Sequence, residues 1–429
     1  MTGTTRPDGR RSIEERLGDA GLPPLPRTAW LEIDLDALAA NLGVVRQLAR
    51  PGVRVEPVVK ADAYGHGAVP VATALEAAGA DGFSVATIDE AVVLRRAGIR
   101  QPILVLFPVP PEEAARAARD GIALTAGDPE LLARLLSRFA SDRDRGAVGR
   151  RALHLQLEVE TGLGRGGFSV AQLPGAVETI RGSSGTRLEG LWSHLAVAED
   201  ATRTQTQRQL FDDALVTLAD GGATIGPSHL AGSGGLLAGV TTYEAIRPGL
   251  AIYGLVPDGF ADGPAAKGNV SALRPVMALR ARPVRVADLP AGWGVSYGPT
   301  FETQRPSRIA TLPLGYADGW PRAASNKAEA LVRGMRVPLV GTVAMDAVMA
   351  DVTDVPGSPV GVDDEFTLLG EDGPERITAL DLARTRATIS WEVVTTMTGR
   401  LPRVYHAAAG VAGLRTLAHG VTAWHPSSS

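Results

Sequence analysis

The stretch VVKADAYGHG, residues 58–67, decides more about this chain than any other segment. An apolar run ends there at Lys60, and a small polar turn, a tyrosine and two glycines around a histidine follow. A lysine at the end of a buried strand is costly unless its amine has a use. Burial lowers the pKa of such an amine, and a neutral amine is a nucleophile that can form a Schiff base. Taken alone, the stretch also fits a lysine that reaches solvent from a strand end.

The composition limits the class of protein. The 429 residues suggest about two or three domains, and an apolar content of 45% permits a large core. The net charge of −4 argues against nucleic acid as a partner. The chain has no cysteine, which excludes disulfides and a thiol nucleophile, and its seven histidines lack ligand spacing, so we expect no metal site. No apolar run approaches the ~18 residues that cross a bilayer. We therefore expect no membrane association, and the absence of a recognisable targeting element favours a cytoplasmic location.

The pattern from about residue 53 to 252 predicts an α/β fold with a (β/α)8 barrel. Short apolar runs alternate there with Ala- and Leu-rich helical stretches. The predicted strands are Val53–Lys60, Gly82–Ala86, Pro102–Phe107, Gly121–Thr125, Ala152–Glu158, Leu188–His194, Thr224–Leu230 and Ala245–Tyr253. Chemistry in such barrels gathers at the carboxyl ends of the strands. Lys60, Arg165, His194 and Ser233 all lie at or just beyond such ends.

The pattern changes after about residue 260, where alternating segments between Gly, Pro and Asp turns predict a mostly β second domain. The segment Ala29–Asp34 also reads as a strand and could join that sheet. The predicted organisation is a flexible extension over residues 1–26, the barrel over 27–262, the mostly β domain over 263–410 and a loosely ordered tail over 411–429.

The segment GLGRGG, residues 162–167, has the glycine spacing of a dinucleotide-binding fingerprint, and Glu189 follows about 20 residues later. This pattern supports a rival hypothesis, an NAD-dependent dehydrogenase. The motif stands late in the predicted barrel, however, and not in an opening βαβ unit, and it contains an arginine. The alternative is that the glycines allow a tight turn that points Arg165 into a site.

The lysine segment closely resembles the cofactor-lysine motif of alanine racemases, and the resemblance spans about residues 29 to 405. Further matching segments are ETGLGR (160–165), SH (193–194), HLAGS (229–233), RPGLAIYG (247–254), WGVSYG (293–298), LGYADGW (314–320) and AMD (344–346). The resemblance implies an isomerase that interconverts L- and D-alanine and holds pyridoxal 5'-phosphate (PLP) on Lys60.

The resemblance also implies roles for other residues of the barrel. Arg165 would bind the substrate carboxylate and the phenolic oxygen of PLP, since a planar guanidinium can hold a carboxylate with two hydrogen bonds. His194 would pack on the pyridine ring, with His229 nearby. Arg247 would face the pyridine nitrogen and, being always protonated, would give it no full proton, which favours proton return over transamination. The phosphate would be bound by the hydroxyls of Tyr64 and Ser233 and by the backbone N–H groups of Gly249 and Leu250.

Racemisation needs one group to remove a proton from one face and another to return it to the opposite face. The resemblance implies that Lys60 and Tyr297 are these two bases. It further implies that Tyr316 lines the substrate entrance, that the N–H of Met345 meets the substrate carboxylate and that Asp346 supports this segment. The equivalents of Tyr297 and Met345 reach into the partner subunit in the family, so the resemblance implies an obligate homodimer with two shared sites.

Four positions depart from the usual family pattern. Glu158 stands where many members have a carbamylated lysine, and its negative charge could hold Arg165 without carbon dioxide. Trp391 replaces a tyrosine that normally reaches the phosphate, Ala344 replaces a frequent cysteine, and Gly232 replaces a frequent asparagine. None of the four removes a proposed base, but together they leave the identity of the substrate open.

Several hypotheses therefore stand beside alanine racemisation. One is a racemase or another PLP enzyme that acts on a different small amino acid. Another is a non-catalytic PLP-binding protein, since simpler relatives with a PLP barrel exist, but these lack the second domain and with it Tyr297. The NAD-dependent dehydrogenase is the third.

Overall fold

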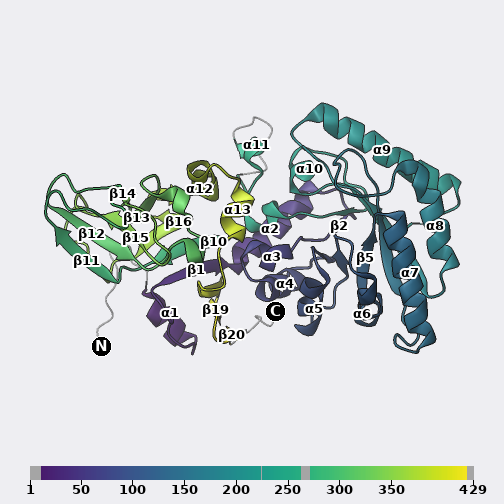
Figure 1. The fold of residues 1–429 in the computed structure, drawn as a ribbon, viewed down its shortest axis with the longest axis horizontal. Coiled ribbons are helices and arrows are strands. Elements are labelled where there is room, and N and C mark those ends of the chain that lie inside the picture. Colours follow the sequence, from purple (N-terminus) through teal and green to yellow (C-terminus); the bar gives the residue numbers. More distant parts are fainter. Residues whose placement is uncertain (1–10, 224, 262–270, 423–429) are drawn as a thin grey trace. The chain divides into compact units, whose positions relative to one another are not determined.

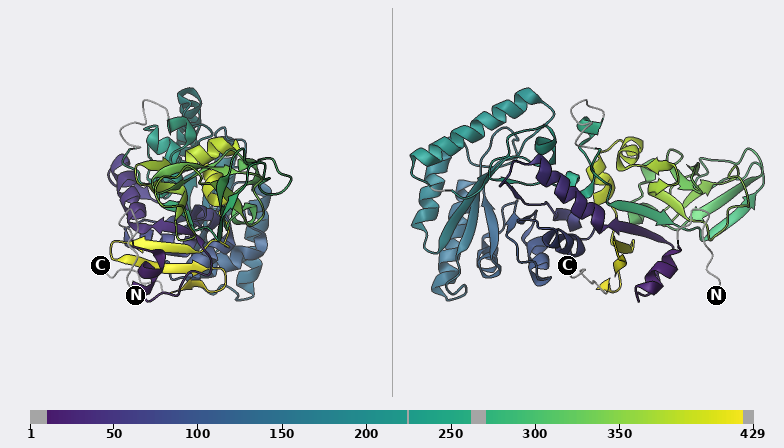
Figure 2. Two further views of the ribbon diagram at one scale, coloured as in Figure 1. Left: turned by 90° about the vertical axis from the view of Figure 1, so that its left-hand side faces the viewer. Right: turned by 180° about the vertical axis from the view of Figure 1, so that it is seen from behind.

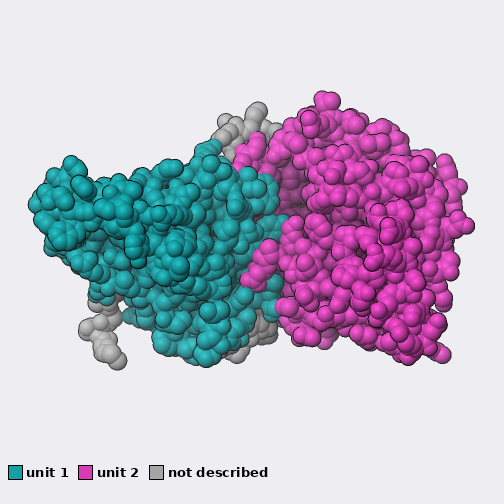
Figure 3. Space-filling model, in the orientation of Figure 1, with its two compact units in different colours: residues 1–38, 64–70, 275–429 teal, residues 39–63, 71–274 magenta. Residues whose placement is uncertain are grey.

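A computed structural model of the protein describes residues 11–223, 225–261 and 271–422 (Figure 1). The chain divides into two compact units (Figure 3). Unit 1 comprises residues 1–38, 64–70 and 275–429, and unit 2 comprises residues 39–63 and 71–274. The predicted boundary between residues 262 and 263 lies outside the described residues, as does residue 224 of one predicted strand.

Unit 2 contains the predicted barrel. Strands β3 to β8 form one parallel sheet in sequence order, and β2 pairs in parallel with β9. Parallel bridges between Val58 and Ser84 and between Gly232 and Arg247 join the two groups, so that the strands close into a ring. The barrel is therefore confirmed. Its strands are β2 (Arg54–Val55), β3 (Phe83–Val85), β4 (Ile103–Val105), β5 (Ile122–Ala126), β6 (Leu153–Glu158), β7 (Thr186–Trp192), β8 (Ser228–His229) and β9 (Ala245–Ile246).

Helices α5 to α9 lie outside the ring of strands (Figures 1 and 2). Strands β3, β4 and β5 are buried at every position, because helices cover one face and side chains fill the barrel on the other. Thr87 begins α5 with a capping box, and Asp128 caps α7 with a proline in its first turn. The helices of unit 2 are α5 (Ile88–Arg96), α6 (Ala114–Asp120), α7 (Pro129–Asp144), α8 (Leu173–Gly182), α9 (Ala201–Asp220), α10 (Ser233–Leu237) and α11 (Asp258–Ala261), with short 3-10 turns at Pro111–Glu113, Val170–Gln172 and Leu250–Tyr253.

Three helical segments contain residues of both units, because the chain passes from one unit to the other within them. They are α2 (Leu35–Leu48), the short turn α3 (Lys60–Tyr64) and α4 (Ala68–Ala77). Among the helices of the described ranges, none is long and apolar enough to span a bilayer.

Unit 1 is built on a sheet in which β1, from the start of the chain, lies between β10 and β18. The strand order is β11-β12-β15-β14-β13-β16-β10-β1-β18-β19-β20, and β17 pairs with β16. Leu31 of β1 lies opposite Leu279 in an antiparallel pair and opposite Arg403 in a parallel pair. The mostly β second domain is therefore confirmed, with Ala29–Asp34 in its sheet.

The strands of unit 1 are β1 (Ala29–Asp34), β10 (Met277–Ala281), β11 (Arg285–Leu289), β12 (Ser307–Leu312), β13 (Glu329–Val332), β14 (Met335–Val340), β15 (Val348–Asp351), β16 (Phe366–Asp372), β17 (Glu375–Ile377), β18 (Arg403–Ala407), β19 (Gly410–Thr416) and β20 (Gly420–Thr422). Its helices are α1 (Ile13–Asp19), α12 (Ala379–Arg386) and α13 (Ser390–Thr395), with 3-10 turns at Tyr316–Asp318 and Arg322–Ala324.

Both ends of the described chain are more ordered than the sequence predicts. Helix α1 begins with a capping box between Ser12 and Glu15, and its Ile13 and Leu17 are buried in a core cluster with Trp30. A helix therefore occupies residues 13–19 of the segment that the sequence predicts as a flexible or weakly helical extension. Strands β19 and β20 occupy much of the range predicted as a loose tail over 411–429, because the edge of the sheet supplies their hydrogen-bond partners. Residues 1–10 and 423–429 lie outside the described residues.

The two glycines of the opening stretch are required by close backbone approaches within unit 1. A Cβ atom on Gly65, which has φ +80°, would lie 2.3 Å from the carbonyl oxygen of Val394. A Cβ atom on Gly67, which has φ +104°, would lie 2.0 Å from the hydroxyl oxygen of Tyr405. Both positions therefore exclude any larger residue.

Candidate active site

Lys60 stands at the start of a backbone turn of unusual conformation. Ala61, Asp62 and Ala63 all have φ between 52° and 54°, which is the left-handed region. Residues other than glycine rarely adopt it, and surrounding contacts must hold them there. One such contact is the N–H of Ala61, which donates to the carboxylate of Glu90 at 2.6 Å. The sequence gives no hint of this turn.

The amine of Lys60 lies among cations. Among the residues that the structure describes, no carboxylate forms an ion pair with it. Burial lowers the pKa of Lys60, the positive charges of Arg165 and Arg247 lower it further, and the negative charge of Glu90 opposes them. The amine is therefore closer to its neutral, nucleophilic form at physiological pH than a surface lysine is.

Arg247 is fully enclosed and holds His229 in one protonation state. Its guanidinium donates to Nδ1 of His229, to the carbonyl oxygen of His229 at 3.1 Å and to that of Ser193 at 2.6 Å. Burial and the charge of Arg247 place the pKa of His229 well below its usual value. The ring is therefore neutral, and its Nε2–H donates to Oε1 of Gln156 at 2.8 Å. Burial lowers the pKa of Arg247 to about 10, so it stays charged at neutral pH.

His194 belongs to the same region. Burial lowers its pKa to about 3, and the positive charges of Arg247, Arg165 and Lys60 contribute further. The imidazole is therefore neutral at physiological pH. Its backbone carbonyl accepts from Nε2 of Gln207 at 3.0 Å, which fixes the loop after β7.

Arg165 is directed by a carboxylate at the end of β6. Oε1 of Glu158 lies 3.4 Å from Nη2 of Arg165, and the same guanidinium lies over the ring of Phe107 at 5.3 Å. Burial raises the pKa of Glu158, while the charges of Arg165 and Arg247 oppose this rise. A buried carboxylate therefore stands where the sequence predicts it, beside the arginine.

The glycine motif forms a turn around a second carboxylate. Glu160 accepts hydrogen bonds from the N–H groups of Gly162, Leu163 at 2.7 Å and Gly164 at 2.9 Å. These donors are the groups that a dinucleotide fingerprint would offer to a phosphate. The motif also follows β6 inside a closed barrel. The dehydrogenase hypothesis is therefore rejected.

A group of hydrogen-bond donors surrounds Ser233 at the start of α10. The N–H groups of Gly249 and Ala251 donate to its Oγ at 3.0 and 3.1 Å. Leu250, which lies between them, begins a 3-10 turn. Convergent N–H groups of this kind suit an anion such as a phosphate.

The remaining predicted site residues belong to unit 1, and three of them lie on loops that are tied together. The N–H of Tyr316 donates to the carbonyl oxygen of Ala344 at 3.2 Å, and Oγ of Ser296 donates to that of Thr342 at 2.6 Å. Tyr297, Tyr316 and Met345 are exposed on these loops, with 74%, 43% and 52% of their surface accessible.

Asp346 and the buried Asp318 both pair with the guanidinium of Arg400, at 2.6 and 3.3 Å. These ion pairs hold the segment that contains Met345.

Burial raises the pKa of the Tyr64 phenol to about 12, so it is a hydroxyl donor at any physiological pH. Trp391 lies partly buried in α13.

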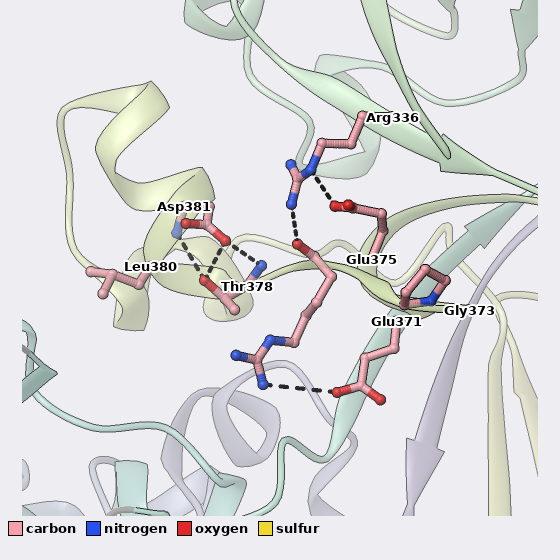
Figure 4. A pocket seen from close by; sticks show the side chains of 9 residues that line it. Arg336, Glu371, Gly373, Glu375, Thr378, Leu380 and Asp381 are labelled. Carbon is pink, nitrogen blue, oxygen red and sulfur yellow. Dashed lines mark hydrogen bonds and ion pairs between the residues drawn. The ribbon is translucent and has the colours of Figure 1, made fainter. Parts of the chain in front are cut away.

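A pocket of about 650 Å3 lies elsewhere in unit 1 (Figure 4). Its charged side chains pair with one another: Arg336 contacts Glu375 at 2.6 Å, and Arg376 contacts Glu371 at 3.9 Å. It contains none of the predicted site residues. We therefore assign it no chemistry.

Three acidic or amide residues of unit 2 were not predicted from the sequence. Gln156 stands two positions before Glu158 on β6, and alternation along a strand places both on the same face. Glu160 lies two positions before the first glycine of the glycine motif. Glu90 completes the T-x-x-E pattern of a capping box with Thr87, which the sequence does display.

Comparison with known proteins agrees with this geometry. The family model described as the alanine racemase N-terminal domain matches residues 33–257, and the C-terminal domain model matches residues 276–405. The alanine racemase of Symbiobacterium thermophilum is 40% identical over 382 residues, which cover 88% of this chain and 97% of that protein.

Solved structures give the same result. The crystal structure of alanine racemase from Bacillus anthracis with bound L-Ala-P has a TM-score of 0.82 and 33% identity, covering 92% of this chain and 99% of that one. A histidine racemase from Leuconostoc mesenteroides has a TM-score of 0.77 and 28% identity, covering 90% and 99%.

Proposed function

This chain belongs to the alanine racemase family, and on that premise we propose that it interconverts L- and D-alanine with PLP bound to Lys60 and with Lys60 and Tyr297 as its two bases. The observation that carries the proposal is the placement of Lys60, whose pKa is lowered by burial and by the positive charges of Arg165 and Arg247. Relatives across most of the chain are alanine racemases, which are isomerases.

The residues of unit 2 fit PLP by their chemistry. Lys60 offers an amine to the aldehyde, and the N–H groups near Ser233 suit the phosphate. Arg165 and the neutral His194 would bind the phenolic oxygen and the ring face, and Arg247 would face the ring nitrogen. When bound, PLP supplies a ring that withdraws electrons from the substrate and makes its α-proton acidic. Tyr64 and Trp391 of unit 1 stay predicted phosphate ligands.

Lys60 and Tyr297 would move the α-proton. The lysine amine would take a proton from one face of the α-carbon or return it there, and the phenol of Tyr297 would act on the opposite face. Arg165, held by Glu158, would bind the substrate carboxylate and fix which bond faces each base. The N–H of Met345 would donate to the same carboxylate, and Tyr316 would limit the size of the substrate side chain.

We further propose that two copies of the chain share their active sites. Tyr297, Tyr316 and Met345 gather on loops tied to one another, and each exposes a large side chain that a lone subunit leaves in water. A partner that covered these side chains would remove apolar surface from water and complete each site. The absence of a nucleic-acid partner and a cytoplasmic location stay predictions from the sequence.

A second candidate substrate is another amino acid. A histidine racemase has a similar fold, so proteins with this fold can act on amino acids other than alanine. Ala344, which stands in place of a frequent cysteine, favours a roomier wall, and Gly232 lacks the polar side chain of a frequent asparagine. Alanine remains the proposed substrate because the relatives at about 40% identity are alanine racemases.

Borohydride reduction followed by mass spectrometry tests where PLP is attached. Lys60, Lys267 and Lys327 are the only lysines of the chain, so the modified peptide identifies the residue unambiguously. We expect the label on Lys60 and its loss in Lys60→Ala. A label elsewhere, or none on the PLP-treated protein, would overturn the proposal.

A chiral product assay with L- and D-isomers of alanine, serine and histidine tests the substrate and the two bases. We expect alanine to react fastest. Tyr297→Phe should slow racemisation in both directions while α-proton exchange with D2O persists for one enantiomer only, because Lys60 still serves one face. Full racemisation by this variant would remove Tyr297 from the mechanism. Tyr243→Phe, which removes a hydroxyl paired with Asp212 at 2.7 Å, is the matched control.

A further inference from the structure

We propose that Glu90 is a positioning residue of the active site, which holds the left-handed turn after Lys60 and presents a negative charge to the lysine amine. The proposal rests on the function proposed above. It concerns a residue of α5 that lies far from Lys60 in the sequence and that also completes the capping box at the start of this helix.

The carboxylate of Glu90 joins the loops that follow two neighbouring barrel strands. Oε1 accepts the N–H of Ala61 at 2.6 Å, immediately after Lys60. Oε2 accepts the N–H groups of Ala86 at 2.8 Å and Thr87 at 3.1 Å, just beyond β3. Both oxygens are therefore engaged, and the turn is tied to the rigid start of α5.

The turn needs such a tie because its backbone is unfavourable. Ala61, Asp62 and Ala63 lie in the left-handed region, where only glycine is at ease. The N–H of Val59 donates to the carbonyl oxygen of Ser84 at 2.9 Å, and the N–H of Ala63 donates to that of Val59 at 2.9 Å. These bonds fix the residues on both sides of Lys60, and the bond to Glu90 fixes the position directly after it.

The charge of Glu90 acts in the opposite sense to the other groups around the amine. Burial, Arg165 and Arg247 lower the pKa of Lys60, whereas Glu90 raises it. A base that alternately takes and returns a proton works best when its pKa lies near the working pH. The charge of Glu90 therefore limits how far the pKa of Lys60 falls.

Three variants separate the two roles. Glu90→Gln removes the charge and keeps one acceptor oxygen, which can serve either the N–H of Ala61 or those of Ala86 and Thr87. Glu90→Ala removes the charge and both acceptors. Asp89→Asn is the matched control, because it removes a carboxylate from the same helical turn, where Asp89 is 86% exposed and contacts Arg116 only at 3.5 Å.

The first measurement is the pH dependence of Lys60 acetylation in the full chain without PLP, followed by mass spectrometry with the exposed Lys327 as internal reference. We expect the labelling midpoint of Lys60 to fall by roughly half to one pH unit in Glu90→Gln, and to stay unchanged in Asp89→Asn. An unchanged midpoint in Glu90→Gln would overturn the electrostatic role.

The second measurement is kcat and KM for alanine with PLP present. We expect kcat to fall by about 10- to 100-fold in Glu90→Ala and less in Glu90→Gln, which retains one acceptor oxygen. Equal activity of Glu90→Ala and the wild type would overturn the positioning role. If the labelling midpoint shifts in Glu90→Gln but the borohydride experiment finds no PLP on Lys60, the coupling to Glu90 is supported and the proposed cofactor site is refuted. The failures of the two proposals are therefore distinguishable.

Discussion

Replacing Glu158 with glutamine should weaken substrate binding, because it removes the negative charge beside Arg165. The two side chains are 3.4 Å apart at their nearest polar atoms. A hydrogen bond between charged groups contributes roughly 1.5–3 kcal/mol, but water screens this pair since 39% of the Arg165 side chain is exposed. We expect a loss of about 1–2 kcal/mol, which is roughly a 5- to 30-fold higher KM.

Because of Glu158, we expect this protein to respond to bicarbonate differently from racemases that carry a carbamylated lysine. The carboxylate supplies a permanent negative charge, so we expect bicarbonate to leave the activity of the wild type unchanged. Glu158→Lys should be weakly active in degassed buffer and should recover with bicarbonate, because carbon dioxide adds to a neutral amine, releases a proton and leaves a carbamate anion.

Initial rates of D-alanine formation from L-alanine, with and without bicarbonate, measure both effects. Glu189→Gln is a suitable control, since this carboxylate pairs with His154 at 2.5 Å and not with Arg165. Burial raises the pKa of Glu158, so KM should begin to rise on acidification at a higher pH than the usual glutamate pKa would give. Bicarbonate activation of the wild type, or an unchanged KM in Glu158→Gln, would refute the reasoning.

Two further predictions concern reaction specificity and stability. Arg247→Glu should increase the release of pyruvate from alanine, measured by a coupled dehydrogenase assay, because a carboxyl group could share a proton with the ring nitrogen; no increase would count against the role of Arg247. Gly67→Ala should destabilise the protein by more than ~2 kcal/mol, measured by denaturant unfolding, because its Cβ would lie 2.0 Å from the hydroxyl oxygen of Tyr405. Gly52→Ala, at φ +83° with no atom within 4 Å of its Cβ, should cost only about 1 kcal/mol, and equal losses would contradict the steric argument.

The sequence was most informative where a local pattern dictates local structure. Largely apolar runs predicted every strand of the barrel, because parallel strands that are covered on both faces are rich in apolar residues. The predicted carboxylate at Glu158 and arginine at Arg165 lie together, because six residues of chain and several glycines connect them.

Features that depend on distant partners were not predictable. Nothing in Ala61 or Ala63 signals a left-handed backbone, which exists because Glu90 and neighbouring strands hold it. Helix α1 is short, and its two buried side chains find their partners in a cluster that includes Leu414 near the other end of the chain. Such pairings follow from topology and not from local propensity.

The position of β1 in its sheet has a consequence for biosynthesis. One edge of β1 can pair with β10 once residue 281 has left the ribosome, but the other edge must wait for residues 403–406. At ~5–20 residues per second the exposed edge would stay open for roughly 6–25 s. During this interval the nascent chain presents an unpaired strand, so chaperones that cover such edges should matter most for its yield when translation is slow.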